Sequence, residues 1–170
     1  MTNQQRHAAD AAAPGRLWVA LGAALAGLAV VLGALGAHGF DRYFAEKYAA
    51  PEFPARSIAG FEVPASWKYL QDYKTAVRYQ MWHALGLIAL GLLAAGSRRR
   101  GLLNAAGWCL FGGVLLFCGS LYALTLGGPH WLDVRWGLVA PVGGTLLIAG
   151  WALFAVGAVR WTAHRPNMGE

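Results

Sequence analysis

The chain contains four long stretches of apolar residues that carry no charge. They cover residues 17–40, 79–97, 101–132 and 136–159, with lengths of 24, 19, 32 and 24 residues. A helix needs roughly 20 mostly apolar residues to cross a bilayer, because the hydrocarbon core is about 30 Å thick. None of the four has the polar stripe at helical spacing that marks a helix of a soluble bundle. The pattern therefore predicts four membrane-spanning helices, at about 17–40, 79–97, 101–127 and 136–161.

The order of these stretches also predicts the fold class. Four successive spans form an all-α membrane protein, an antiparallel bundle of four transmembrane helices with both termini on the same side. The transmembrane domain, 17–161, would lie between a polar N-terminal tail, 1–16, and a polar C-terminal tail, 162–170. The alternative for the first stretch is a cleaved signal peptide, but its apolar run exceeds the 7–15 residues of a signal core.

Composition narrows the classes of function. The chain of 170 residues is 57% hydrophobic and only 13% charged, whereas soluble domains average about 25% charged residues. This composition excludes a soluble enzyme, a disordered tail and a nucleic-acid module, although the net charge is +6. The expected partners are the lipid bilayer and either another membrane protein or a second copy of the chain, with no nucleic acid.

Basic residues indicate the orientation of the chain. Lys and Arg number seven on the side of the termini and seven on the side of the loop 41–78. Three of the first seven are consecutive, at 98–100, and a dense basic turn resists translocation more than charges spread along a loop. We therefore expect a multi-pass protein of the cell (inner) membrane, with cytoplasmic termini and an extracytoplasmic loop.

The long loop 41–78 has two parts of different character. Pro51, Pro54 and Pro64 prevent one continuous helix through it, because proline lacks the backbone donor that a helix interior requires. From Ala65 the segment is predicted to be helical and to continue into the second span. The first part is either a solvated loop with aromatic anchors or a binding lid.

Small residues indicate how the helices pack. Glycine accounts for 23 of the 170 residues, and small side chains let helix backbones approach closely within a membrane. A ridge of residues four apart in the first span is expected to face a neighbouring helix, as are two glycines in the fourth. The predicted packing residues are Ala29, Gly33 and Ala37, with Gly143 and Gly144.

The few polar side chains of the spans lie at one end of each helix. Because successive helices alternate in direction, these ends are expected to meet on the side of the long loop. Polar groups in a membrane usually face the interior of the protein. Pro141 is expected to interrupt the fourth helix and to free backbone carbonyls there. The candidate polar cluster consists of His38, Tyr79, Gln80, His83, Ser120, Tyr122 and Pro141.

The two histidines of this cluster allow three interpretations. Each would place one ring nitrogen in water at the interface, or the pair would bind haem or a metal ion, or both would handle protons on a permeation path. Ser120 and Tyr122 are typical of residues that hydrogen-bond between helices. The spans contain no Ser-His-Asp or Cys-His arrangement and no carboxylate pair. We therefore expect no catalytic residue, no metal site and no cofactor.

Four segments of the chain resemble a known family. They are GALGAHG at 33–39, KTAVRYQMWHALGL at 74–87, FCGSLYAL at 117–124 and PVGGTLLIAGW at 141–151. In this order, and over roughly residues 17–160, they resemble domain-of-unknown-function family 423, a family of small four-helix membrane proteins. The resemblance implies the fold and the membrane location but no activity. The recurrent positions of the family map to Gly36, Ala37, His38, Tyr79, Gln80, His83, Gly119, Ser120, Tyr122, Pro141, Gly143 and Gly144.

These observations lead to three hypotheses about function. The first is a non-catalytic integral membrane protein with an accessory or assembly role, since tight helix packing is indicated and catalytic groups are lacking. The second is a small transporter or permeation element for protons, metal ions or a small solute, which would use the polar cluster near the loop. The third is a haem- or metal-binding membrane protein that uses the two histidines.

Overall fold

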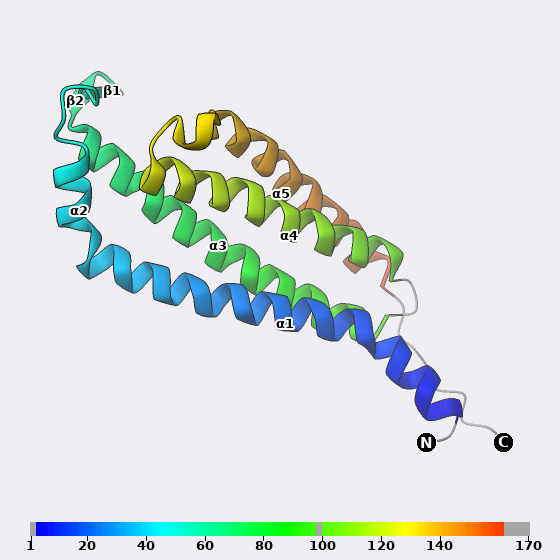
Figure 1. Cartoon of the computed structure of the whole chain (residues 1–170). Helices are drawn as coiled ribbons and strands as arrows, with labels where there is room; N and C mark the ends of the chain where they lie inside the picture. The colour runs from blue at the N-terminus through cyan, green and yellow to red at the C-terminus, as the bar shows by residue number, and fades with distance from the viewer. Residues whose placement is uncertain (1–2, 98–99, 162–170) are drawn as a thin grey trace.

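Four long helices lie side by side in the structure, a computed structural model that describes residues 3–97 and 100–161 (Figure 1). In chain order they are α1 (Asn3–His38), α3 (Ala65–Ala95), α4 (Gly101–Tyr122) and α5 (Trp136–Val159). The prediction of an all-α protein is therefore confirmed. Two residues of the basic turn, 98 and 99, and the predicted C-terminal tail, 162–170, lie outside the described residues.

Three segments are long and apolar enough to cross a membrane, namely Gly15–His38, Gly101–Gly127 and Trp136–Val159. Their positions agree closely with the predicted first, third and fourth spans. α3 is also long, with 31 residues, but polar side chains such as Gln80 interrupt its apolar run. α1 begins at Asn3, well before the predicted span, because the alanine-rich segment 8–13 consists mainly of the strongest helix former.

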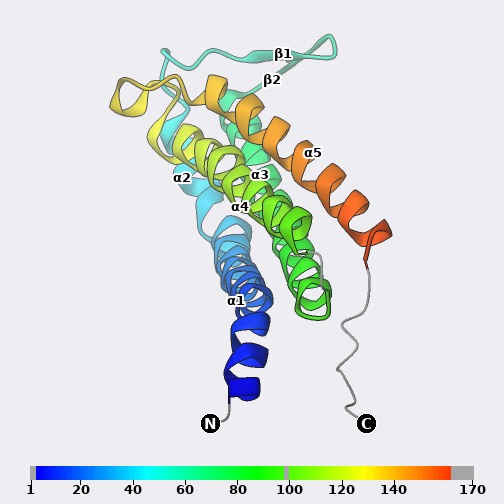
Figure 2. The ribbon, with the colours of Figure 1, turned by 90° about the vertical axis from the view of Figure 1, so that its right-hand side faces the viewer.

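The helices form an open row rather than a closed bundle. α1 packs along α3, α3 packs against α4, and α4 packs along α5, with each helix antiparallel to the next (Figure 1). In both views α1 and α5 lie on opposite sides of the α3–α4 pair (Figure 2). The predicted antiparallel order is correct, but the outer helices lie apart (Figure 2), and few residues of their apolar segments are buried.

The contact between α1 and α3 depends on small residues that recur every seven positions. A methyl group on the first of them, Gly15, would lie 2.7 Å from the Gly91 carbonyl oxygen of α3. One on Gly22 would lie 2.6 Å from the Ala84 carbonyl oxygen, so the two backbones touch. A seven-residue repeat keeps one face of a helix against its partner in a left-handed supercoil. The buried small residues of this seam are Gly15, Gly22, Ala29 and Gly36.

This seam differs from the predicted ridge of residues four apart. Ala29 is buried, with 1% of its surface exposed, and Gly33 lies at the edge of the seam near Val77. Ala37, however, is exposed, and Gly36 occupies the buried position against the ring of Tyr73. The difference arises because a period of four drifts around the helix, whereas a period of seven stays on one face.

Glycines at the same spacing join α4 and α5. A methyl group on Gly150 would lie 2.8 Å from the Leu110 side chain, and one on Gly143 would overlap the backbone nitrogen of Phe117. Gly144 is less constrained, because its methyl group would lie 3.8 Å from the Phe117 ring. Three glycines of α5 thus face three large residues of α4, in the order Gly143, Gly150 and Gly157 against Phe117, Leu110 and Leu103.

The segment between α1 and α3 is folded, which its prolines did not indicate. It contains α2 (Phe40–Lys47) and an antiparallel hairpin of β1 (Arg56–Ile58) and β2 (Phe61–Val63). Ala59 and Gly60 form its two-residue turn, with positive φ angles of 51° and 84°, a geometry typical of tight hairpins. Alanine rarely adopts a positive φ angle, so the sequence carries only a weak hairpin signal.

α3 begins at Ala65, as predicted, but its first half lies beside α1 instead of in a loop. Gly22 of α1 packs against Ala84, and the two helices are antiparallel. Arg78, six residues before Ala84, therefore lies level with about residue 28 of α1. The predicted loop 41–78 ends at residue 64. Ala65 and Tyr69 pack against Phe44 and Tyr48, and Tyr73 and Val77 lie beside Gly36 and Gly33 in the second half of the first span.

A single methyl group tests the α4–α5 seam. We expect Gly143→Ala to lower the unfolding midpoint of the purified protein in detergent, because overpacking typically costs about 1–3 kcal/mol. The matched control is Gly137→Ala, whose methyl group would meet nothing within 4 Å. Thermal unfolding of both variants checks this expectation, and equal midpoints would contradict a close contact at Gly143.

Candidate functional site

Gln80 of α3 is the centre of the polar side chains inside the protein. It is 2% exposed. Its Nε2 donates to the Leu25 carbonyl oxygen of α1 at 2.9 Å, and its Oε1 accepts from the Tyr122 hydroxyl of α4 at 3.0 Å. A buried amide is costly unless its donor and acceptor are both paired. Gln80 meets that condition by joining three helices.

Tyr73 extends this site, although the predicted cluster omits it. It lies two turns before Gln80 on the same face of α3 and is fully buried. Its hydroxyl donates to the Leu32 carbonyl oxygen of α1 at 2.7 Å, and its ring lies 5.5 Å from the ring of Tyr122 in a T-shaped arrangement. The seven-residue spacing from Gln80 was the signal that would have identified it. We call Tyr73, Gln80 and Tyr122 the three-helix polar site.

His83 lies next to this site but faces α5. Its Nδ1 is 2.6 Å from the Tyr79 carbonyl oxygen, and a carbonyl only accepts, so Nδ1 carries a hydrogen. In the neutral imidazole Nε2 then has the lone pair. The imidazole is 6% exposed. Its centroid lies 5.7 Å from the Tyr79 ring and 6.1 Å from the Trp151 ring of α5. Aromatic rings therefore enclose the one histidine of the second span.

The remaining predicted residues do not join the three-helix polar site. The Ser120 hydroxyl donates to the Phe117 carbonyl oxygen within its own helix, at 2.9 Å. Pro141 is exposed, and α5 continues through it. The predicted interruption there is wrong, because proline removes a single hydrogen bond near the start of the helix. The Thr145 hydroxyl donates to the Pro141 carbonyl oxygen at 3.0 Å.

The two histidines lie far apart. His83 is level with Gly22 of α1, since Gly22 packs against the adjacent Ala84, and His38 is exposed 16 residues further along α1. This separation corresponds to roughly 24 Å along the helix axis. Ligands of one metal ion lie only about 2 Å from it. The interpretation of His38 and His83 as a ligand pair within one chain is therefore wrong.

The depth of the site also differs from the prediction. Gln80 and His83 lie beside Leu25 and Gly22, near the middle of the segment Gly15–His38. They do not lie at the end of α1 near the loop. In the part of the chain that the structure describes, no three His, Cys, Asp or Glu side chains are grouped closely enough to hold a metal ion.

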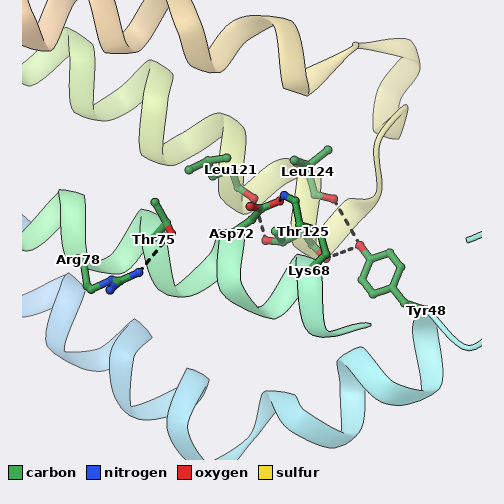
Figure 3. A network of polar contacts seen from close by, with 8 residues as sticks. All are labelled: Tyr48, Lys68, Asp72, Thr75, Arg78, Leu121, Leu124 and Thr125. Atoms are coloured by element: carbon green, nitrogen blue, oxygen red, sulfur yellow. Dashed lines mark hydrogen bonds and ion pairs between the residues drawn. The ribbon is translucent and has the colours of Figure 1, made fainter. Parts of the chain in front are cut away.

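A second polar arrangement covers the end of α4, where the chain continues as the π-helix η1 (Ala123–Gly127). The hydroxyl of Tyr48, the residue that follows α2, donates to the Thr125 carbonyl oxygen at 2.6 Å and reaches the Leu124 carbonyl oxygen at 3.4 Å (Figure 3). Tyr43 and Lys47 of α2 donate to the Leu126 carbonyl oxygen. The last carbonyls of a helix lack intrahelical partners. Side chains of α2 therefore supply the missing donors.

The phenol of Tyr48 stays protonated over a wide pH range. Burial raises the pKa of Tyr48 well above its usual value, and the neighbouring Tyr69 and Tyr43 raise it further. A tyrosine in the unfolded chain ionises near pH 10. Because the folded-state pKa is the higher one, the contribution of Tyr48 is complete below about pH 10 and is lost as pH rises toward the folded-state value.

The hydrogen bond between Gln80 and Tyr122 is expected to contribute measurably to the free energy of unfolding. We expect Gln80→Leu and Tyr122→Phe each to destabilise the protein in detergent. A double-mutant cycle should give a coupling of about 0.6 kcal/mol, the average for hydrogen bonds between helices in membranes. The control cycle pairs Gln80→Leu with Ser120→Ala, whose hydroxyl bonds within its own helix, and should be additive. Additivity in both cycles would argue against the Gln80–Tyr122 hydrogen bond.

The Tyr48 cap predicts a pH dependence. Tyr48→Phe should lower the free energy of unfolding by about 1 kcal/mol, the usual value of one hydrogen bond. The difference between wild type and variant should stay constant from about pH 6 to pH 9 and shrink above about pH 10. Denaturant unfolding in detergent across this range measures the difference. A difference unchanged at pH 11 would contradict the cap.

The chain is similar to membrane proteins of several bacteria. It is 36% identical to the UPF0382 membrane protein YwdK of Bacillus subtilis over 146 residues, which cover 86% of this chain and 98% of YwdK. A UPF0382 membrane protein of Staphylococcus saprophyticus is 33% identical over 145 residues, 85% of this chain and 98% of that protein. One of Haemophilus influenzae is 31% identical over 131 residues, 77% and 84% of the two chains. No solved structure matches the chain.

The match to a protein family includes the three-helix polar site. Residues 32–144 match the family described as "Protein of unknown function (DUF423)", and this range contains Tyr73, Gln80 and Tyr122. The relatives are named as membrane proteins, in agreement with the apolar segments of this chain. The resemblance carried by the four short segments is thus confirmed, and the chain belongs to the DUF423 family of UPF0382 membrane proteins.

Proposed function

We propose that the protein is a non-catalytic integral membrane protein with an accessory or assembly role. The observation that carries this proposal is the use of polar groups inside the helices. The side-chain amide of Gln80 uses both its donor and its acceptor in hydrogen bonds to neighbouring helices. Among the described residues, no buried side-chain nitrogen or oxygen lacks a hydrogen-bond partner. Polar groups used in this way hold helices together.

The proposed topology has four spans in the cell (inner) membrane. α3 is the second span, and both termini lie in the cytoplasm. The fully buried Leu87 and Leu90 support a position of α3 inside the membrane, and α3 packs between α1 and α4. A helix at this place in an open row has neighbours on two sides. The basic turn 98–100 then lies on the cytoplasmic side, as the positive-inside rule requires.

The outer faces of the row supply the surfaces for assembly. α1 exposes Val30 and Val31, with 61% and 57% of their surfaces accessible, and α5 exposes Ile148 with 74%. Because α1 and α5 each have a neighbouring helix on one side only, each presents a broad apolar surface on the other side. Helices of another membrane protein or of a second copy would pack against these sides.

A permeation element is the second candidate. His83 keeps the Nε2 lone pair of a neutral imidazole near the middle of the helices. Two open grooves of about 450 and 530 Å³ lie near the loop, one lined by Tyr73 and the other by Tyr122. The paired rings of these tyrosines separate the grooves. A path for protons or a small solute would have to pass this pair.

Photo-cross-linking in living cells tests the assembly role. A benzophenone side chain placed at Val31 or Ile148, on the two edge helices, should give a discrete cross-linked product at one edge or both. The control position is Leu90, which is fully buried and should give none. The His38→Ala/His83→Ala double variant should keep the same product, since the proposal assigns no chemistry to either imidazole.

Two results would speak against this proposal. One is the absence of a discrete product at both edges in folded protein. The other is flux of protons or ions through proteoliposomes above that of empty vesicles between pH 5.5 and 8, a range that brackets the usual histidine pKa of about 6.5. Flux that disappears in His83→Ala would favour the permeation element instead.

A further inference from the structure

A groove of about 450 Å³ opens between α1 and α3 at the loop end of their seam. α1 contributes Gly33 and Gly36, and α3 contributes Gln71, Lys74, Val77 and Arg78. The groove exists because the α1 side lacks bulk: a methyl group on Gly33 would already lie 3.4 Å from Val77. Its volume is in the range of sites for small molecules.

Two cations share this groove without a counter-ion. Lys74 and Arg78 are exposed and lie one turn apart on α3. Neither forms an ion pair with any side chain that the structure describes, whereas Arg42 pairs with Glu46 and Lys68 pairs with Asp72. The Arg78 guanidinium makes a long hydrogen bond of 3.4 Å to the Thr75 hydroxyl (Figure 3). The residues that line the groove include no carboxylate.

The surroundings of Arg78 favour a bound anion. Arg78 lies level with about residue 28 of α1, and on that part of α1 the exposed side chains are apolar, with Leu28 49% and Val30 61% accessible. A charged side chain beside lipid is costly unless it reaches the interface or pairs with another charge. A guanidinium binds a phosphate through two parallel hydrogen bonds.

We propose that this groove binds the headgroup of an anionic phospholipid, with the phosphodiester between Lys74 and Arg78. Gln71, near the mouth of the groove, would donate to the hydroxyls of the headgroup. Val77 and the glycines of α1 would line the start of the acyl chains. The occupant is a lipid and not free phosphate, because Val30, about one turn before Gly33 on α1, presents an exposed apolar side chain to acyl chains.

This lipid site is independent of the assembly role. It requires only that α1 and α3 lie in a membrane, and loss of the lipid would leave the edge residues Val31 and Ile148 where they are. Cross-links at the edges would therefore persist when lipid binding is lost. The two proposals fail separately.

The test compares lipid binding to the full-length protein and to three variants. Purified protein in detergent is titrated with phosphatidylglycerol, phosphatidylcholine or inorganic phosphate, and bound lipid is counted by native mass spectrometry. The Lys74→Ala/Arg78→Ala variant should bind phosphatidylglycerol about 30-fold more weakly, given the usual contribution of each basic residue near a membrane. Both side chains are exposed, so the variant is expected to fold, and circular dichroism checks this.

Two further variants separate the groove from net charge. Arg42→Ala/Arg135→Ala removes the same charge from exposed positions outside the groove and should retain phosphatidylglycerol binding. Ala37→Leu fills the mouth of the groove from an exposed position without a change in charge and should weaken binding.

Four results would overturn the lipid site. The first is equal binding of phosphatidylglycerol by wild type and the Lys74→Ala/Arg78→Ala variant, and the second is the same loss of binding in the Arg42→Ala/Arg135→Ala control. The third is the same affinity of the wild type for phosphatidylcholine as for phosphatidylglycerol. The fourth is inorganic phosphate that binds as tightly as phosphatidylglycerol.

Discussion

The close contact of helix backbones through glycine is the constraint on which the rest of the structure depends. Lipid offers no hydrophobic force between apolar helices, so van der Waals packing must supply the association energy. Gly22 against Ala84 and Gly143 against Phe117 bring two helix pairs into backbone contact. Both pairs are formed by helices adjacent in the row. The third contact, α3 with α4, is less intimate, and there the protein places the hydrogen bond between Gln80 and Tyr122.

The polar residues follow from this division. Between α4 and α5, where glycines set the helix distance, the facing residues are apolar or small. Tyr73 and Gln80 of α3 donate to carbonyls of α1 along the first glycine seam. Gln80 also accepts from Tyr122 across the contact between α3 and α4. His83 stands outside this pattern, since its ring contacts aromatic residues and its Nδ1 bonds within α3. In its neutral form this imidazole has one lone pair, on Nε2.

The apolar segments Gly15–His38, Gly101–Gly127 and Trp136–Val159 were predictable because apolar length alone identifies them. The register between helices was not, since a ridge with period four and a seam with period seven share Ala29 and diverge at Ala37 and Gly36. Gln80 and Tyr122 were correctly grouped from their positions near helix ends. Tyr73 and the depth of Arg78 were missed because residues 65–78 contain charges typical of a loop. The first position of the hairpin turn holds Ala59 in place of the usual asparagine, aspartate or glycine, so that Gly60 alone was a weak signal for the hairpin.

The cap that α2 places on η1 has a consequence for how the chain enters the membrane. Each glycine seam joins two helices that are neighbours in the row. The pair α1–α3 comes before the pair α4–α5 along the chain, so each of these two helical hairpins contains both sides of its own seam. Tyr48, however, is synthesised long before the carbonyl of Thr125 that it binds. The phenol therefore stays in contact with water until the helical hairpin α4–α5 has been synthesised. This hydrogen bond therefore forms only when the two helical hairpins pack together, which is the last step in folding of the chain.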